Sequence, residues 1–176
     1  MKLHLGCGTK HLDGFVNVDS RYCVPEVDVV DDIRTLTKFN SNSVELIYAC
    51  HVLEHVGRRE YMAVLKRWRE ILKSDGILRL AVPDFESVIN HYVKNHNIEA
   101  VRGLLWGGQD YPTNYHYIGW DFDRLKKDLE EIGFKNVQRY DRDKTEHSHV
   151  DDYSASFLPK MDRSGMLMSL NITCIK

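Results

Sequence analysis

The sequence predicts an α/β fold, with a twisted and mostly parallel sheet and helices on both of its faces. Two observations carry this prediction. Short apolar segments bounded by Gly, Pro or Asp alternate along the chain with longer segments whose apolar residues recur at helical spacing. The 176 residues suffice for one domain with a sizeable core, and no repeat or low-complexity linker divides them. We therefore expect a single domain over residues 1–176.

Five short segments are predicted to be strands before residue 83. They are rich in aliphatic residues, and they span residues 2–6, 15–19, 27–30, 44–49 and 77–82. The last segment is almost wholly apolar, which favours a central, parallel position. Only residues 7–14 separate the first two segments, fewer than the roughly dozen residues that a parallel crossover needs, so we expect a turn there and no helix.

Three segments are predicted to be amphipathic helices. The turn residues 74–76 are expected to end the first, whose apolar residues are Tyr61, Val64, Leu65, Trp68, Ile71 and Leu72. The second follows Asp84, a suitable N-cap, and its expected apolar side consists of Phe85, Val88, Ile89, Tyr92 and Val93. The third begins at Asp121 and stops at Gly133, with one face formed by Phe122, Leu125, Leu129 and Ile132. Residues 134–140 and 168–175 are predicted to be the last strands, joined by a long loop.

Composition and charge narrow the class of protein. A formal net charge of −2 provides no general attraction for nucleic acid or for an anionic membrane, and no apolar run approaches the length of a membrane span. A strand is predicted almost directly after Met1, which leaves no room for a signal peptide. The cysteines form no C-x-x-C pair and are scattered at Cys7, Cys23, Cys50 and Cys174. These features are typical of a protein of the reducing cytoplasm.

The turn after the first strand is the most informative segment. Residues 3–9 read LHLGCGT, and residues 15–19 form a second strand that ends on Asp19. Glycine permits positive φ and close approach of the backbone to a ligand. The Asp19 carboxylate can accept two hydrogen bonds from a ribose diol. This arrangement is typical of sites that hold an adenosine-containing cofactor.

These segments, taken in order, resemble the motifs of a class I S-adenosylmethionine (SAM) dependent methyltransferase over nearly the whole chain. Residues 3–8 are similar to its SAM-binding motif, and Asp19 matches the acidic residue that closes its second strand. Residues 30–33 are similar to its adenine-contacting segment, and residues 43–55 to its fourth strand and the loop that follows. Residues 68–78 and 129–134 resemble later helix ends and the fifth strand. The resemblance implies a Rossmann-like fold with a C-terminal antiparallel hairpin.

The resemblance also implies SAM as the cofactor and assigns roles to individual residues. The backbone of Gly6, Cys7 and Gly8 would lie against the methionine portion of SAM, and Asp19 would bind its ribose. Asp32 and Ile33 would contact adenine, and Cys50 with His51 would line the reacting centre. An acceptor that carries a proton needs a base, and imidazole titrates in a useful range. The candidate bases at the carboxyl ends of the strands are His51, His55, His116 and Asp84, of which we favour His51 and His116.

An aromatic loop is the candidate acceptor site. Residues 106–120 contain five aromatic residues and three glycines, and similar methyltransferases have a histidine at the position of His116. The loop could form a ring-lined lid over an acceptor, or its rings could simply cap the sheet. The net charge favours a small-molecule or sugar-like acceptor over a nucleic acid.

Three other interpretations remain open. Residues 51–55 spell H-x-x-E-H, so His51, Glu54 and His55 could make a zinc-dependent hydrolase with a third ligand from residues 147–152. The pattern follows a strand and does not lie within a long helix, so no metal ligand is assigned; Glu54 and His55 could instead fix the loop. A nicotinamide-dependent oxidoreductase shares the glycine turn, but a second substrate domain is lacking. Finally, Lys10 stands where a third glycine is often found, which is compatible with a non-catalytic protein of this fold.

Overall fold

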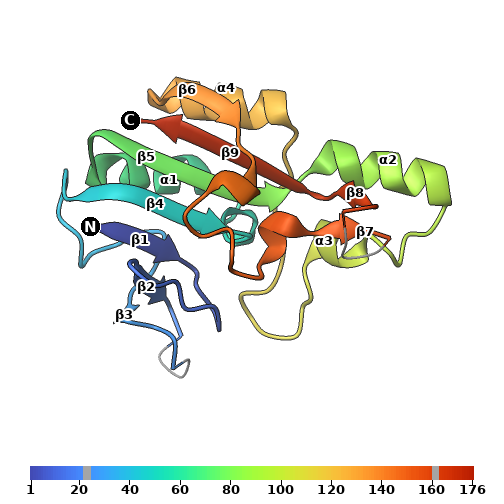
Figure 1. Cartoon of the computed structure of the whole chain (residues 1–176), viewed down its shortest axis with the longest axis horizontal. Coiled ribbons are helices and arrows are strands. Elements are labelled where there is room, and N and C mark those ends of the chain that lie inside the picture. Colours follow the sequence, from blue (N-terminus) through green and yellow to red (C-terminus); the bar gives the residue numbers. More distant parts are fainter. Residues whose placement is uncertain (22–24, 160–162) are drawn as a thin grey trace.

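The computed structural model describes residues 1–21, 25–159 and 163–176, and Cys23 lies outside them. A seven-stranded sheet has the order β3-β2-β1-β4-β5-β9-β6 (Figure 1). Its parallel strands are β1 (Lys2–Leu5), β2 (Val16–Asp19), β3 (Val29–Val30), β4 (Val44–Cys50) and β5 (Leu72–Pro83). The antiparallel part consists of β9 (Ser169–Ile175), which pairs with β5 and with β6 (Lys135–Arg139). The predicted sheet, with its antiparallel C-terminal end, is thus confirmed.

One face of the sheet packs against two helices. Helix α1 (Tyr61–Ile71) buries Tyr61, Val64, Leu65, Trp68 and Ile71, and α4 (Phe122–Ile132) buries Leu125 and Leu129 in the same core. The alternate residues of the central strands meet them because a strand turns every second side chain to the same face. These residues, all nearly inaccessible to solvent, are Leu3, Leu5, Ile47, Ala49, Leu78 and Leu80.

The other face is covered by a long loop, where the sequence predicts helices. Residues 141–156, which include the 3₁₀ turns η2 (Arg142–Lys144) and η3 (Tyr153–Ala155), cross in front of the sheet in Figure 1, with α1 behind it. In this loop His147 stacks on Tyr48 with 3.9 Å between ring centroids, and Val150 packs in a small cluster with Leu12 and Phe15. As expected, residues 6–15 form only a turn between β1 and β2, so this connection contributes no helix to the cover of this face.

Helix α1 ends earlier than its sequence predicts. Its C-cap is Leu72, where the chain is already extended, and β5 begins at once. Residues 74–76 therefore lie within the irregular start of β5, whose register against β4 shifts between Val44 and Leu46. Strand β5 is interior but parallel only to β4.

Helix α2 (Phe85–Asn95) begins at Asp84 as predicted, but its expected apolar side is not buried. The Asp84 side chain accepts a hydrogen bond from the Glu86 N–H at 3.2 Å. Only Val88 and His91 are buried, whereas Phe85, Ile89, Tyr92 and Val93 are 39–61% exposed. The reason is position: α2 runs beyond the carboxyl end of β5 and meets α3 (Arg102–Trp106) and β8 (Met166–Leu167) in place of the sheet.

Several short elements were not anticipated from the sequence. Besides η2 and η3 they include α3, the 3₁₀ turn η1 (Leu53–His55), and a small hairpin of β7 (Phe157–Leu158) with β8. Helix α4 ends at Gly133 in the left-handed conformation, as predicted. No helix in the described ranges is both long and apolar enough to cross a membrane.

We expect Gly6→Ala to destabilise the protein. Gly6 has φ +64°, and a Cβ placed there would lie 2.3 Å from Cγ2 of the buried Val52. Strain and overpacking should together lower the free energy of unfolding by about 1–3 kcal/mol. The matched control is Gly103→Ala in α3, where a Cβ meets nothing within 4 Å and the stability should stay the same or rise by up to about 1 kcal/mol. Urea unfolding measures both, and equal stabilities would contradict the expectation.

Because of His147 in the loop of residues 141–156, we expect the free energy of unfolding to fall in mild acid. Burial, with a smaller contribution from Arg79, lowers the pKa of His147 from 6.5 to about 4. Below pH 6.5 the unfolded chain takes up this proton before the folded one, so the stabilisation is complete above pH 6.5 and is lost as pH falls toward 4. We expect a loss on the order of 2 kcal/mol over this window.

The variant His147→Phe tests whether His147 causes this pH dependence, because phenylalanine keeps an aromatic ring against Tyr48 but cannot titrate. Its unfolding free energy should fall less between neutral and acid pH than that of the wild type. Some slope should remain, because burial also lowers the pKa of His4. The exposed His149 supplies the control, since His149→Ala should keep the wild-type slope. Identical slopes for His147→Phe and wild type would contradict the assignment.

Candidate active site

A cleft of about 420 Å³ opens at the carboxyl ends of the parallel strands. In a sheet of this kind, ligands bind at that edge. Among the predicted site residues, Gly6, Asp19, Asp32, Ile33 and His51 line the cleft. The others, Cys7, Gly8, Cys50 and His116, do not line it. The structure therefore brings together residues of β1, β2 and the segments after β3 and β4.

The Asp19 carboxylate is held in place by the backbone. It ends β2 and is 6% exposed, and it accepts hydrogen bonds from the N–H groups of Gly8 at 2.9 Å and Arg21 at 3.0 Å. The Arg21 side chain also donates to both of its oxygens, at 3.1 and 3.3 Å. Burial acts to raise the pKa of Asp19, but these donors outweigh it and lower the pKa. Asp19 is thus an ionised hydrogen-bond acceptor, and the Gly8 N–H holds its carboxylate in place.

The two aspartates after β3, Asp31 and Asp32, differ in their surroundings. Asp31 is buried and accepts a hydrogen bond from the Lys38 N–H at 2.9 Å, so it shapes the loop. Asp32 faces the cleft, where the Arg34 side chain donates to it at 2.6 Å and lowers its pKa. The carbonyl of Ile33 accepts a hydrogen bond from Trp68 Nε1 at 2.8 Å, which fixes this wall of the cleft to α1.

Neither predicted cysteine is reactive in this fold. Burial, then the charge of Asp19, raises the pKa of Cys7 to about 12. Burial likewise raises the pKa of Cys50, which packs at the edge of the Leu12, Phe15 and Tyr48 cluster. Both therefore remain neutral thiols at physiological pH.

A buried glutamate lies at the centre of three histidines. Glu54 in η1 is 0% exposed, and its Oε1 lies 3.2 Å from Nδ1 of His51 and 4.0 Å from Nε2 of His116. The rings of His55 and His116 are 4.8 Å apart between centroids. Burial acts to raise the pKa of Glu54, but His51, ahead of the smaller contributions of His55 and His116, outweighs it and lowers the pKa. The sequence places Glu54 beside His51 and His55, but only the fold adds His116.

The geometry does not support a zinc peptidase built on the H-x-x-E-H pattern. That site needs two histidines on one face of a helix, with the glutamate as base. Here His51 ends β4 with φ +52°, and His55 belongs to a three-residue 3₁₀ turn. His147, a possible third ligand, belongs to the covering loop and stacks on Tyr48.

The aromatic loop of residues 106–120 divides between core and cleft. Trp120 is 1% exposed and packs edge-on against Tyr61, so this ring caps the core. Tyr111 and Tyr117 line the cleft, and the Tyr117 N–H donates to the carbonyl of Glu54 at 2.9 Å. The Arg21 guanidinium lies over the Tyr111 ring at 5.3 Å, which joins the loop to the Asp19 site. The capping interpretation thus holds for Trp120, whereas the acceptor-lid interpretation stays a prediction for Tyr111 and Tyr117.

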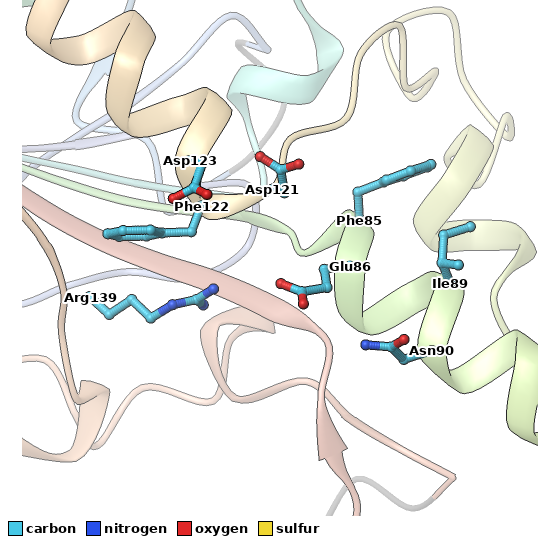
Figure 2. Close-up of a pocket in the computed structure, with 8 residues that line it drawn as sticks. All are labelled: Phe85, Glu86, Ile89, Asn90, Asp121, Phe122, Asp123 and Arg139. Carbon is cyan, nitrogen blue, oxygen red and sulfur yellow. The ribbon is translucent and has the colours of Figure 1, made fainter.

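A second cavity of about 550 Å³ lies apart from these residues. Phe85, Glu86, Ile89 and Asn90 of α2 line it, and Figure 2 shows Glu86 and Asn90 directed toward the side of Arg139 of β6. Arg139 donates to Asp84 at 3.2 Å and stacks over Phe122. None of the predicted cofactor residues lines this cavity. The smaller cleft is therefore the candidate active site.

Comparisons with known proteins agree with this fold. Residues 3–80 match the model of a family described as a methyltransferase domain. A SAM-dependent methyltransferase from Archaeoglobus fulgidus has a TM-score of 0.60 and 17% identity, covering 99% of this chain and 85% of that one. For a SAM-dependent methyltransferase from Methanosarcina mazei the TM-score is 0.63 at 14% identity, with 99% and 91% covered.

A third similar structure contains bound ligands. It is the 1,6-didemethyltoxoflavin-N1-methyltransferase of Burkholderia thailandensis with its substrate and S-adenosylhomocysteine, at a TM-score of 0.60 and 16% identity, with 99% of this chain and 70% of that chain covered. No curated protein matches the chain in sequence. At such identities the structural likeness concerns the fold, whereas the family match includes Gly6, Asp19, Asp32 and His51. Residues 3–80 therefore match a methyltransferase domain, and the fold of the chain is that of these SAM-dependent methyltransferases.

Proposed function

We propose that residues 1–176 form one domain that transfers a methyl group from SAM to a small-molecule acceptor entering the cleft under Tyr111 and Tyr117. The observation that carries this proposal is the convergence of Asp19, Asp32 and His51 on one cleft beneath those rings. The net charge of −2 argues against a nucleic-acid acceptor. The ring-lined entrance suits a compact molecule with an apolar body.

The described residues fit the cofactor. The volume of about 420 Å³ falls in the range of roughly 300–1,000 Å³ usual for small-ligand sites. Asp19 is ionised and oriented by two backbone donors, so a ribose diol could take the place of the Arg21 side chain without moving the carboxylate. That side chain is 35% exposed and can turn toward solvent. Asp32 and Ile33 then form the adenine end of the cleft, and His51 lies toward the reacting end.

Bound SAM supplies an activated methyl group, so the protein needs mainly to align the acceptor and exclude water. For an acceptor that loses a proton, we assign proton removal to His51. The Glu54 carboxylate, 3.2 Å from Nδ1 of His51, carries the charge opposite to that of the imidazolium that proton removal would form. His116 is off the cleft and would act through Glu54 as a positioning residue.

Removal of the ribose acceptor should weaken cofactor binding. We expect Asp19→Ala to reduce the affinity for SAM and for S-adenosylhomocysteine by about 1–3 kcal/mol, the scale of charge-assisted hydrogen bonds left unmade. Isothermal titration calorimetry measures both. Asp13→Ala is the control, because that side chain is 95% exposed and lies outside the cleft. Unchanged affinity of Asp19→Ala would mean that the ribose lies elsewhere.

Catalysis and acceptor class can be tested with radiolabelled SAM. Cell extract is separated into a small-molecule fraction, a nucleic-acid fraction and a protein fraction, and each is incubated with the enzyme. We expect label in the small-molecule fraction, and we expect His51→Asn to lose most of it while keeping its affinity for S-adenosylhomocysteine. Label in nucleic acid or protein would overturn the acceptor class. Cofactor binding with no label in any fraction would favour a non-catalytic protein.

A further inference from the structure

The Glu54 carboxylate has no adequate partner within the described ranges. It is 0% exposed, and neither oxygen accepts a well-aligned hydrogen bond from the described residues. Nδ1 of His51 is near enough for an ion pair at 3.2 Å but is not aligned to donate. A buried charged group without hydrogen bonds is costly, so such carboxylates are usually paired or coordinate a metal. The neighbours of Glu54 decide between these possibilities.

The two rings beside Glu54 are oriented as metal ligands are. Nδ1 of His55 lies 3.1 Å from the carbonyl oxygen of Tyr115, and Nδ1 of His116 lies 2.9 Å from that of Leu104. A backbone carbonyl only accepts, so in both rings Nδ1 carries the proton. Each neutral ring then keeps Nε2 as an unprotonated lone pair. A second ring nitrogen bonded to a carbonyl is the usual outer support of a metal-binding histidine.

These ligand atoms converge. One ligand atom each of Glu54, His55 and His116 lies within 4.8 Å of the other two. Donors on a tetrahedral zinc with bonds of about 2.0–2.1 Å are roughly 3.3 Å apart, so small side-chain rotations would close the set. Nε2 of His116 lies 4.0 Å from Oε1 of Glu54, and a cation between such atoms would compensate the buried negative charge. We propose that Glu54, His55 and His116 bind a divalent first-row transition-metal ion.

The position of the proposed metal site beside the cleft would allow the ion to take part in catalysis. His55 lines the cleft, whereas Glu54 and His116 lie behind it, so coordination positions left open by three protein ligands adjoin the acceptor entrance. A metal there would bind an acceptor oxygen and make its proton easier to remove. This use rests on the proposed function, but the metal site itself does not. The ion would also join η1 to the aromatic loop, which the Tyr117 N–H already ties to the Glu54 carbonyl.

The site can be tested by titrating tag-free, metal-stripped protein with Zn²⁺ and with Mn²⁺, using calorimetry and, for Mn²⁺, electron paramagnetic resonance. We expect one ion per chain and a higher Tm in its presence. Glu54→Gln keeps the buried shape without the charge, and His116→Asn retains a donor for the Leu104 carbonyl without Nε2. Each should weaken binding by at least about a hundredfold, since even outer supports of a ligand are worth 10–100-fold. The exposed His149 provides the control His149→Ala, which should bind normally.

The outcomes separate this proposal from the proposed function. Wild-type protein that binds S-adenosylhomocysteine but neither ion would overturn the metal site and leave the methyltransferase proposal standing. Ion binding that persists in both Glu54→Gln and His116→Asn would also overturn it, because the ion would then lie elsewhere. If Glu54→Gln fails to fold, His116→Asn and the metal dependence of its Tm decide the question. Loss of metal binding with retained S-adenosylhomocysteine binding in His116→Asn would support the site.

Discussion

The short connection between β1 and β2 is the constraint on which the rest of the structure depends. Residues 6–15 must return the chain to a neighbouring parallel strand without a helix. The turn is closed by a hydrogen bond from the Cys7 N–H to the Val18 carbonyl and by the Asn17 side chain, which accepts from the Leu12 N–H at 2.9 Å. With no helix in this connection, one face of the sheet lacks its usual cover. Residues 141–156 take that place, which explains why histidine and tyrosine rings stack where aliphatic helices are common.

The same constraint shapes the cofactor end of the cleft. A helix after β1 would present several backbone donors to the cofactor, whereas the turn presents few. Binding strength then depends on side chains that are fixed in advance, and Asp19 and Asp32 are both ionised and held by arginine and backbone donors. Both arginines compensate the charge of the carboxylates, and Arg21 also connects Asp19 to Tyr111 of the aromatic loop. Access to Asp19 is therefore coupled to the position of that loop.

Glu54 connects the remaining parts of the cleft. It lies in η1, directly after β4, and its carbonyl accepts from the loop at Tyr117 while its carboxylate lies among His51, His55 and His116. The loop is also held by the contact between Nδ1 of His55 and the Tyr115 carbonyl at 3.1 Å. The end of β4, the 3₁₀ turn and the aromatic loop are thereby held as one wall of the site.

Local chemistry in the sequence was sufficient for the strands of the seven-stranded sheet and for the caps at Asp84, Asp121 and Gly133. It also placed Asp19 at the end of β2 and Asp32 just after β3, because periodicity and capping act over a few residues. Tertiary structure alone decided that α2 leaves the sheet, so that Phe85 and Val93 are exposed despite their helical spacing. It also decided that a loop covers the second face and that His116 joins His55 and Glu54 across some sixty residues of chain. Such contacts depend on how distant elements pack, and no short-range pattern records them.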